Sequence, residues 1–254
     1  MIRFSANLGF LWTDRPLPDA IHAAASAGFH AVECHWPFDT PTTEINAALK
    51  ETGLPMLGLN TRRGNIEAGD NGLAAIPGRE DEARHAITEA LTYADAISTG
   101  AVHVMAGFAD GKTAHDTFIR NLKFAANAAV PLDITILIEP LNRHDAPGYF
   151  LNTTDQARAI IEEVASPNLK LMFDCYHVGR TEGDVITLLR DLFPLIGHIQ
   201  FASVPDRGTP DHGEIDYQAI FSEIAALGWT KPLGAEYKPE GKTEDTLQWM
   251  AKFR

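Results

Sequence analysis

Short apolar runs and longer segments of helical period alternate eight times along this chain, and this alternation constrains the fold more than any other feature. The runs are rich in Ile, Val and Phe and predict buried strands, whereas the segments between them predict helices. Strands are predicted at residues 3–8, 31–36, 55–60, 101–107, 135–141, 169–177, 197–203 and 233–239. Helices are predicted at residues 17–28, 42–53, 79–98, 114–129, 153–165, 182–193, 216–228 and 243–253. Because each crossover helix returns the chain to begin a parallel neighbour, eight such units predict a (β/α)₈ TIM barrel.

Several predicted helices have typical end signals. The predicted N-caps are Thr153 or Thr154, Asp216 and Thr243. Helix ends are predicted at Gly28, Gly53, Gly100 and Gly228, because glycine readily adopts a positive φ.

An open, doubly wound sheet is the competing fold, and it would favour a glycine-rich phosphate loop after the first strand. The first predicted strand is followed instead by Gly9-Phe10-Leu11-Trp12. Residues 107–113 (GFADGKT) resemble a P-loop but have three residues between the glycines where the motif has four. We predict a surface loop there, from which Lys112 could reach an anionic substrate.

The composition fits one barrel domain over residues 1–254, with 45% hydrophobic residues and no Pro/Gly/Ser-rich linker. The formal net charge of −13 argues against a nucleic-acid partner, because such binding depends on Lys and Arg contacts to phosphates. No signal peptide and no apolar stretch of about 18 residues is found, which predicts a soluble, cytoplasmic protein without membrane association. Cys34 and Cys175 form no CxxC motif, as expected in a reducing compartment. Association into a homo-oligomer is left open.

The candidate chemistry lies at the ends of the last four predicted strands. Each of these strands ends in a polar residue after an apolar run, and these residues are Glu139, Asp174, Gln200 and Glu236. Active sites of (β/α)₈ barrels lie at this end of the strands. Three converging carboxylates would repel one another unless a cation joined them, and an oxygen-rich set suits Mg²⁺ or Mn²⁺. The alternative is that each residue forms a salt bridge or caps a neighbouring loop.

Three further residues are candidates for contact with a substrate. His177, three residues after Asp174, could bond a substrate hydroxyl or act as a further metal ligand. Arg207, in the loop after the seventh strand, could clamp a carboxylate through two hydrogen bonds, although a solvated surface charge is the alternative. His103, on the fourth strand, is expected to line or support the pocket.

Five ordered segments, IPGREDE (76–82), IEPLNRHDAPGYFLNTTDQA (138–157), FDCYHVGRTEGD (173–184), IGHIQFASVPDRGTPDHGEIDY (196–217) and EYKP (236–239), resemble the hydroxypyruvate isomerase family. That family is part of the xylose-isomerase-like TIM barrels, and the resemblance covers essentially the whole chain. It implies a divalent metal held by Glu139, Asp174, Gln200 and Glu236, with Glu139 and Glu236 as the acid/base pair. It also implies substrate contacts for His177 and Arg207.

The resemblance implies an aldose–ketose isomerase that converts hydroxypyruvate to tartronate semialdehyde. The segment VPDRGTPDHGE equally resembles the 2-oxo-tetronate isomerases, and Ser203 stands where many hydroxypyruvate isomerases have an aspartate. Sugar 3-epimerases are a further alternative, although many of them have histidine in place of Gln200. The remaining alternatives are an endonuclease IV-like phosphodiesterase, which would need a histidine-rich zinc cluster, and a non-enzymatic sugar-acid binding protein.

Overall fold

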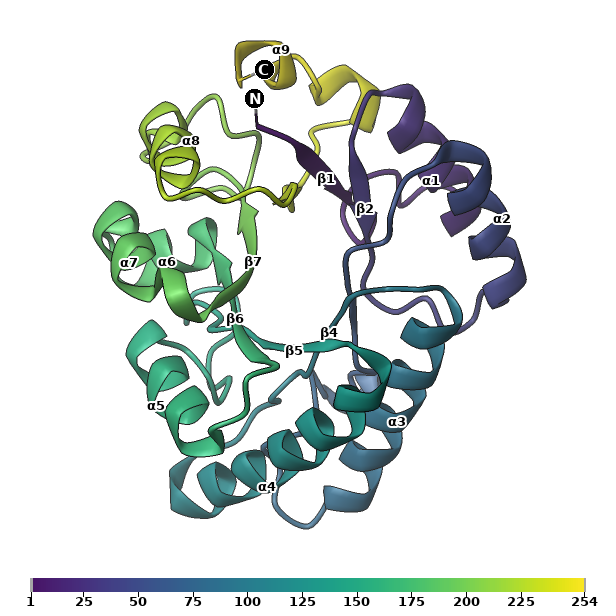
Figure 1. Ribbon diagram of the computed structural model, residues 1–254. Coiled ribbons are helices and arrows are strands. Elements are labelled where there is room, and N and C mark those ends of the chain that lie inside the picture. The colour runs from purple at the N-terminus through teal and green to yellow at the C-terminus, as the bar shows by residue number, and fades with distance from the viewer. Residues whose placement is uncertain (1, 254) are drawn as a thin grey trace.

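Parallel strands line the centre of the computed structural model, which describes residues 2–253, and helices surround them (Figure 1). The strands are β1 (Phe4–Asn7), β2 (Ala31–Glu33), β3 (Leu59–Asn60), β4 (Ala101–His103), β5 (Thr135–Ile138), β6 (Leu169–Asp174), β7 (Ile196–Phe201) and β8 (Leu233–Ala235). Their order is β2-β1-β8-β7-β6-β5-β4-β3. The predicted (β/α)₈ barrel is therefore confirmed.

The barrel closes between β2 and the segment that leads into β3. Val32 forms an isolated parallel bridge with Met56. The Leu57 amide donates to the Val32 carbonyl at 2.8 Å, and the Cys34 amide donates to the Gly58 carbonyl at 3.1 Å. These bonds join the two ends of the sheet, although the ladder here is shorter than between other neighbours.

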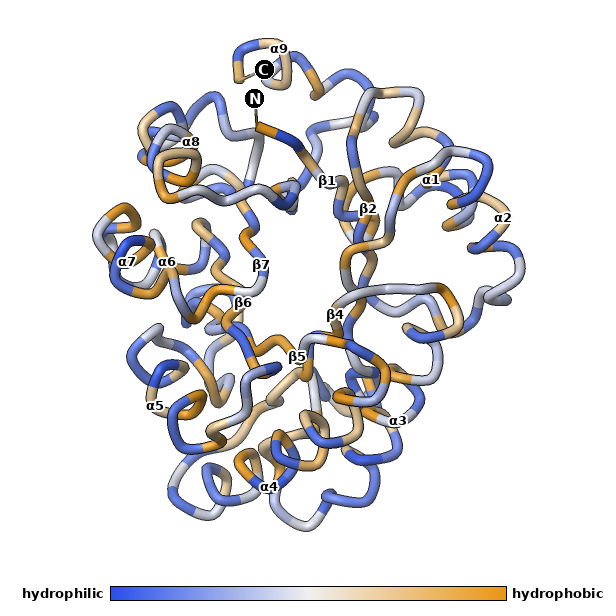
Figure 2. The backbone as a smooth tube through the Cα atoms, in the orientation of Figure 1, coloured by the Kyte–Doolittle hydropathy of each residue, from blue (hydrophilic) through white to orange (hydrophobic). Residues whose placement is uncertain are grey.

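The surrounding helices are α1 (Leu17–Ser26), α2 (Thr42–Thr52), α3 (Glu80–Ala96), α4 (Gly111–Ala129), α5 (Thr154–Val164), α6 (Cys175–Thr181), α7 (Val185–Leu192), α8 (Tyr217–Ala226) and α9 (Trp249–Phe253). Short 3₁₀ turns lie at Ile66–Ala68, Val130–Leu132, Phe193–Leu195 and Thr243–Thr246. Apolar residues at helical spacing explain why the outer helices pack on the sheet: in α5, Ala157, Ile160, Ile161 and Val164 are buried. Figure 2 shows hydrophobic and hydrophilic stretches alternating along α5 and α7. No helix within residues 2–253 is long and apolar enough to cross a membrane.

The sixth predicted strand, residues 169–177, is too long at its C-terminal end. Strand β6 stops at Asp174, and α6 begins at Cys175. The Asp174 carboxylate accepts a hydrogen bond from the Tyr176 amide at 2.8 Å and so caps this helix. The prediction was wrong here because a buried helical turn is as apolar as a buried strand, and periodicity cannot separate the two over so few residues.

Two of the predicted N-caps are confirmed and a third is wrong. The Thr153 side chain accepts from the Gln156 amide, and the Asp216 side chain accepts from the Ala219 amide. Thr243 caps no helix, because its hydroxyl accepts from the Trp12 amide at 2.9 Å. The predicted helix over residues 243–253 is divided into a 3₁₀ turn and α9.

Two further predictions differ from the structure: the helix end at Gly100 and the surface loop at residues 107–113. Helix α3 does not extend to Gly100, since Ser98 takes the left-handed conformation with φ of 54°. Residues 107–113 are not wholly a surface loop, because α4 begins at Gly111. Lys112 forms an ion pair with Asp116 at 2.7 Å in the first turns of that helix.

Candidate active site

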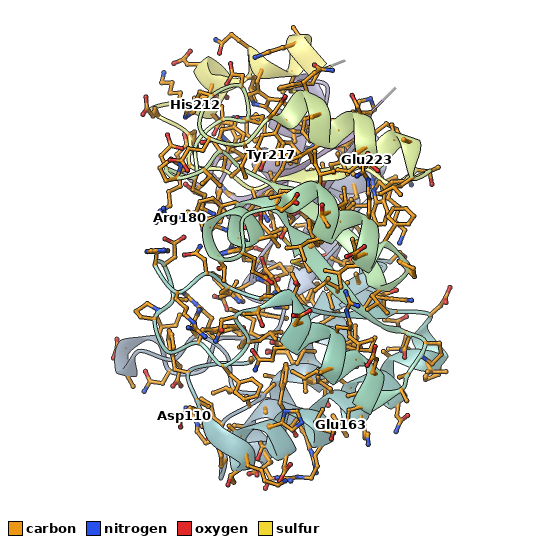
Figure 3. All side chains as sticks on the ribbon, turned by 90° about the vertical axis from the view of Figure 1, so that its left-hand side faces the viewer. Asp110, Glu163, Arg180, His212, Tyr217 and Glu223 are labelled. Carbon is orange, nitrogen blue, oxygen red and sulfur yellow. The ribbon has the colours of Figure 1, made fainter. Side chains whose placement is uncertain are left out.

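Polar residues end the strands around the whole barrel. Within one residue of the C-terminal end of each strand, from β1 to β8, lie Asn7, Glu33, Asn60, His103, Glu139, Asp174, Gln200 and Glu236. The loops beyond these ends lie on one side of the molecule, where Figure 3 labels Asp110, Arg180 and His212 along the left. The parallel arrangement therefore gathers polar side chains from distant parts of the sequence at one end of the barrel.

Four of the predicted residues form a tight buried group. Glu139, Asp174, His177 and Glu236 each offer one ligand atom, and these atoms lie within 4.8 Å of one another. All four side chains are buried. Glu139 and Glu236 follow β5 and β8, whereas Asp174 ends β6 and His177 lies in the first turn of α6.

Gln200 lies beside this group with its amide oxygen free. Its Nε2 donates to Glu33 Oε1 at 2.7 Å and, more weakly, to Glu236 Oε1 at 3.3 Å. Its Oε1 is buried and accepts no hydrogen bond from the part of the chain that the structure describes. The same holds for Glu139 Oε1 and Asp174 Oδ2. Buried oxygens are seldom left unpaired, so these three atoms fit a cation that the residues would share.

The charges in this group also favour a cation. Burial raises the pKa of Glu139 well above its ordinary value, and the charges of Glu236 and Asp174 raise it further. Burial and Glu236 raise the pKa of Asp174 to about 7. Burial acts in the same direction on Glu236, but Arg207 and His35 outweigh it and lower that pKa to about 2. Carboxylates this close cannot all be ionised without added positive charge, and three carboxylates with an amide oxygen suit a hard divalent ion.

His177 has a defined tautomer. Its Nδ1 accepts a hydrogen bond from the Asn142 backbone amide at 3.0 Å, which leaves the proton of a neutral imidazole on Nε2. Burial lowers the pKa of His177 to about 3, and the charge of Arg207 acts in the same direction. Nε2 lies 3.8 Å from Asp174 Oδ2 and 3.9 Å from Glu139 Oε1. His177 is therefore a hydrogen-bond donor facing the site, which argues against its role as a further metal ligand.

Arg207 is an inward-facing cation and not the solvated surface charge considered as its alternative. Its guanidinium lies against two rings, 4.6 Å from the Phe10 centroid and 5.0 Å from the Tyr176 centroid. It forms a close ion pair with Glu236 and lies 3.8 Å from Asp174 Oδ2. Only 12% of its side chain is exposed. A planar cation held between two rings at the edge of this group is suited to bind a carboxylate.

His103 and His35 complete the wall of the site. His103 Nδ1 lies 3.7 Å from Glu139 Oε2, and burial lowers the pKa of His103 to about 4. Neither ring nitrogen of His103 has a hydrogen-bond partner among residues 2–253. His35 Nε2 lies 3.1 Å from Glu236 Oε1. The structure thus brings His103 to the group, where both of its nitrogens remain available.

Sequence reasoning missed several residues that shape the site. Asn7 Nδ2 donates to Glu236 Oε1 at 2.8 Å and to Glu33 Oε1 at 3.1 Å. Asn7 and Glu33 are the polar residues that end the apolar strands β1 and β2, so the signal used for the last four strands could have identified them. Asp145 accepts from the Tyr176 hydroxyl at 2.7 Å, but it belongs to a loop that has no such pattern.

The chain belongs to the xylose isomerase-like TIM barrel family, whose model matches residues 21–253. The 2-oxo-tetronate isomerase of Cupriavidus necator is 43% identical over 100% of this chain and 99% of its own length. The hydroxypyruvate isomerase of Escherichia coli is 38% identical, with 100% of both chains covered. Family and full-length relatives together identify the chain as an enzyme of the isomerase type.

Solved structures agree on the fold. The crystal structure of an AP endonuclease, family 2, from Brucella melitensis is 38% identical, covers 100% of both chains and has a TM-score of 0.96. A 3-keto-D-glucoside 4-epimerase from Escherichia coli has a TM-score of 0.83 at 20% identity, with 99% of both chains covered. The second similarity shows the fold alone.

Proposed function

We propose that this enzyme is a divalent-metal-dependent isomerase that moves a carbonyl group between adjacent carbons of a small hydroxy acid, with hydroxypyruvate and tartronate semialdehyde as the leading pair. The observation that carries the proposal is the buried group of Glu139, Asp174 and Glu236 beside the free amide oxygen of Gln200. The isomerase names of relatives at 43% and 38% identity support the same reaction type.

Glu139, Asp174, Gln200 and Glu236 would hold the metal, and Mg²⁺ or Mn²⁺ suits their oxygen atoms. A bound divalent ion would act as a Lewis acid that stabilises negative charge on oxygen by several kcal/mol. The residues themselves must still remove a proton beside the carbonyl and return one to the adjacent carbon.

Glu139 and Glu236 would divide the proton transfer, one removing the proton beside the carbonyl and the other returning a proton to the adjacent carbon. Glu236 is held ionised by Arg207 and His35. The pKa of Glu139 is raised by burial and by the charges of Glu236 and Asp174, and a cation bound beside it would favour its ionised form. The proton on His177 Nε2 is available to a substrate oxygen.

The carboxylate of the substrate would bind at Arg207. Charge-assisted, two-point pairing with a guanidinium recognises a carboxylate and orients the carbons next to it. This contact fits a keto acid better than a neutral sugar. A four-carbon 2-oxo acid is the second candidate substrate, favoured by the 43% identity to a 2-oxo-tetronate isomerase.

DNA cleavage fits this site less well, although the related structure from Brucella melitensis bears the name of an endonuclease. Three carboxylates and an amide form the oxygen-rich group, with histidines beside it that accept or donate hydrogen bonds. The formal net charge of −13 also opposes binding to a polyanion.

The test is turnover with hydroxypyruvate, a four-carbon 2-oxo acid and DNA with an abasic site, each measured with and without Mg²⁺ or Mn²⁺ after chelation. We expect metal-dependent isomerisation of at least one keto acid and no cleavage of the DNA. Isomerisation that continues at full rate in excess chelator would contradict the proposed metal dependence. Cleavage of the DNA without isomerisation of a keto acid would contradict the proposed reaction type.

Replacing Glu139 or Glu236 with Gln tests the proton transfer. Each change keeps an oxygen for the metal but removes the proton-transfer group, so turnover should fall by about 100-fold or more while metal binding survives. Deuterium exchange from solvent into substrate, followed by NMR, shows which half of the transfer each variant has lost. Glu162→Gln, at an exposed position, is the control and should behave like the wild type. Near-normal turnover and exchange in both active-site variants would refute the two-glutamate mechanism.

A further inference from the structure

Glu33 is a buried carboxylate outside the four predicted ligands, and both of its carboxylate oxygens accept hydrogen bonds from neighbouring side chains. It ends β2, with 3% of its surface exposed. Oε1 accepts from Gln200 Nε2 at 2.7 Å and from Asn7 Nδ2 at 3.1 Å, and Oε2 accepts from His198 Nε2 at 2.8 Å. A buried charge with three donors costs much less than an unpaired one, and it holds those donors in fixed orientations.

The bond from Glu33 determines which way the Gln200 amide faces. With Nε2 bonded to Glu33, the amide oxygen is left without a hydrogen-bond partner in the described chain, as a metal ligand requires. A flipped amide would put its oxygen against Glu33 Oε1, and the two oxygens would repel each other. Asn7 is constrained similarly, because its Nδ2 bridges Glu33 and Glu236 while its Oδ1 accepts from the Gly9 amide at 2.9 Å.

Below Glu33, a cavity of about 280 Å³ occupies the N-terminal half of the barrel. Glu33, Gln200 and His198 line it together with apolar residues such as Met56 and Leu137. Gly234 leaves the room for this arrangement, because a Cβ there would lie 2.5 Å from Glu33 Oε1 and 2.8 Å from Gln200 Cγ. With a cavity on that side, a Gln200 amide that lost Glu33 would have space to rotate.

We propose that Glu33, supported by His198, is a positioning residue of the metal site: it turns the Gln200 oxygen toward the metal and holds the Asn7 amide against Glu236. This inference depends on the metal of the proposed function. It assigns Glu33 no contact with substrate and makes it act through Gln200 and Asn7.

Two conservative variants separate hydrogen-bond geometry from charge. Glu33→Gln keeps the length and one acceptor oxygen for Gln200, and its amide nitrogen can donate to His198 Nε2 when the neutral imidazole carries its proton on Nδ1. Glu33→Asp keeps the charge but withdraws the acceptor by one methylene. We expect Glu33→Asp to weaken Mn²⁺ binding by about 10- to 100-fold, the usual effect of losing a residue that orients a metal ligand, while Glu33→Gln stays close to the wild type.

The affinity for Mn²⁺ alone is measured by calorimetry, without substrate or turnover. Met56→Leu, in the same cavity, is the control for altered packing and should bind Mn²⁺ like the wild type. In a Gln200→Leu background, Glu33→Asp should cause little additional loss, because the group through which it acts is gone. Circular dichroism melting verifies that each variant is folded.

Equal affinities of Glu33→Asp and the wild type would overturn the positioning role. So would a Glu33→Gln variant that binds Mn²⁺ as weakly as Glu33→Asp, since an acceptor oxygen at the original distance would then not be enough to orient Gln200. If Glu33→Asp weakened Mn²⁺ binding in the Gln200→Leu background as much as in the wild type, Glu33 would act on the metal site by a route other than Gln200. Failure of the wild type itself to bind Mn²⁺ would refute the metal of the proposed function, and the inference with it.

Discussion

Arg207 places a positive charge at the edge of a group of buried carboxylates, between the rings of Phe10 and Tyr176. In this position the guanidinium interacts with Glu236 and Asp174, and a substrate carboxylate would compete for the same donors. One residue therefore affects both the ionisation of Glu236 and the proposed recognition of the acid group.

Arg207→Ala should raise KM for keto-acid substrates by about 10- to 100-fold, because a charge-assisted hydrogen bond contributes about 1.5–3 kcal/mol. KM for a neutral sugar, if one is turned over, should change much less. Steady-state kinetics on both substrate classes makes the comparison, and Arg143→Ala, an exposed arginine bonded to Asn152, is the matched control. Equal changes for both classes would remove Arg207 from carboxylate recognition.

At the level of elements, the loop after β7 holds Arg207 in place through its own small network. Asp206 Oδ2 lies 2.7 Å from His212 Nε2, and the Ser203 hydroxyl bonds to Asp206. The Lys238 amide donates to the Arg207 carbonyl at 2.7 Å, which joins this loop to the segment after β8. Arg207 has a φ of 59°, so its backbone depends on such support.

The Asp206–His212 pair predicts a pH window for this loop. The hydrogen bond to Asp206 raises the pKa of His212 above 6.5. Burial opposes ionisation of Asp206, but bonds from Ser203 and His212 lower its pKa to about 2. The contribution of His212 to folding stability is complete below pH 6.5 and is lost as pH rises through the raised pKa. The contribution of Asp206 to folding stability is complete above pH 3.8 and is lost as pH falls toward 2.

An NMR titration of the His212 imidazole tests this window. The wild-type pKa should exceed 6.5, and Asp206→Asn should bring it back toward that ordinary value. His22, which is on α1, provides an internal reference that should not respond to Asp206→Asn. An unchanged His212 pKa in the variant would show that Asp206 does not stabilise the protonated ring.

For the whole molecule, an aromatic cluster joins the two ends of the chain. Trp249 of α9 packs 4.9 Å from Phe4 and 5.5 Å from Phe201, measured between ring centroids. Its Nε1 donates to the Tyr237 hydroxyl at 3.3 Å. Figure 1 shows α9 next to β1, so the C-terminal helix covers the strand that begins the barrel.

Trp249→Ala should lower the free energy of unfolding by about 3–5 kcal/mol, because it removes a fully buried aromatic side chain and leaves a cavity. Urea denaturation monitored by circular dichroism measures the change. Lys252→Ala, at an exposed position of the same helix, should have little effect. A loss below about 1 kcal/mol would show that α9 contributes little to the stability of the barrel.

The pattern of apolar runs was enough to predict the barrel and the placement of Glu139, Asp174, Gln200 and Glu236 at strand ends. Period and strand polarity are local properties, and parallel topology converts them into a common edge. The same reasoning could have extended to Asn7 and Glu33.

Only the tertiary structure decided how these residues act. The sequence did not indicate that α6 begins at Cys175, so neither the capping role of Asp174 nor the position of His177 on a helix could be predicted. The tautomer of His177 depends on the Asn142 amide, and the ionisation of Glu236 depends on Arg207, each a contact between residues far apart in the chain. Residue identity and spacing determined which groups come together at the strand ends. Their tautomers and ionisation were decided by packing, because hydrogen-bond direction and electrostatic coupling depend on distances in space.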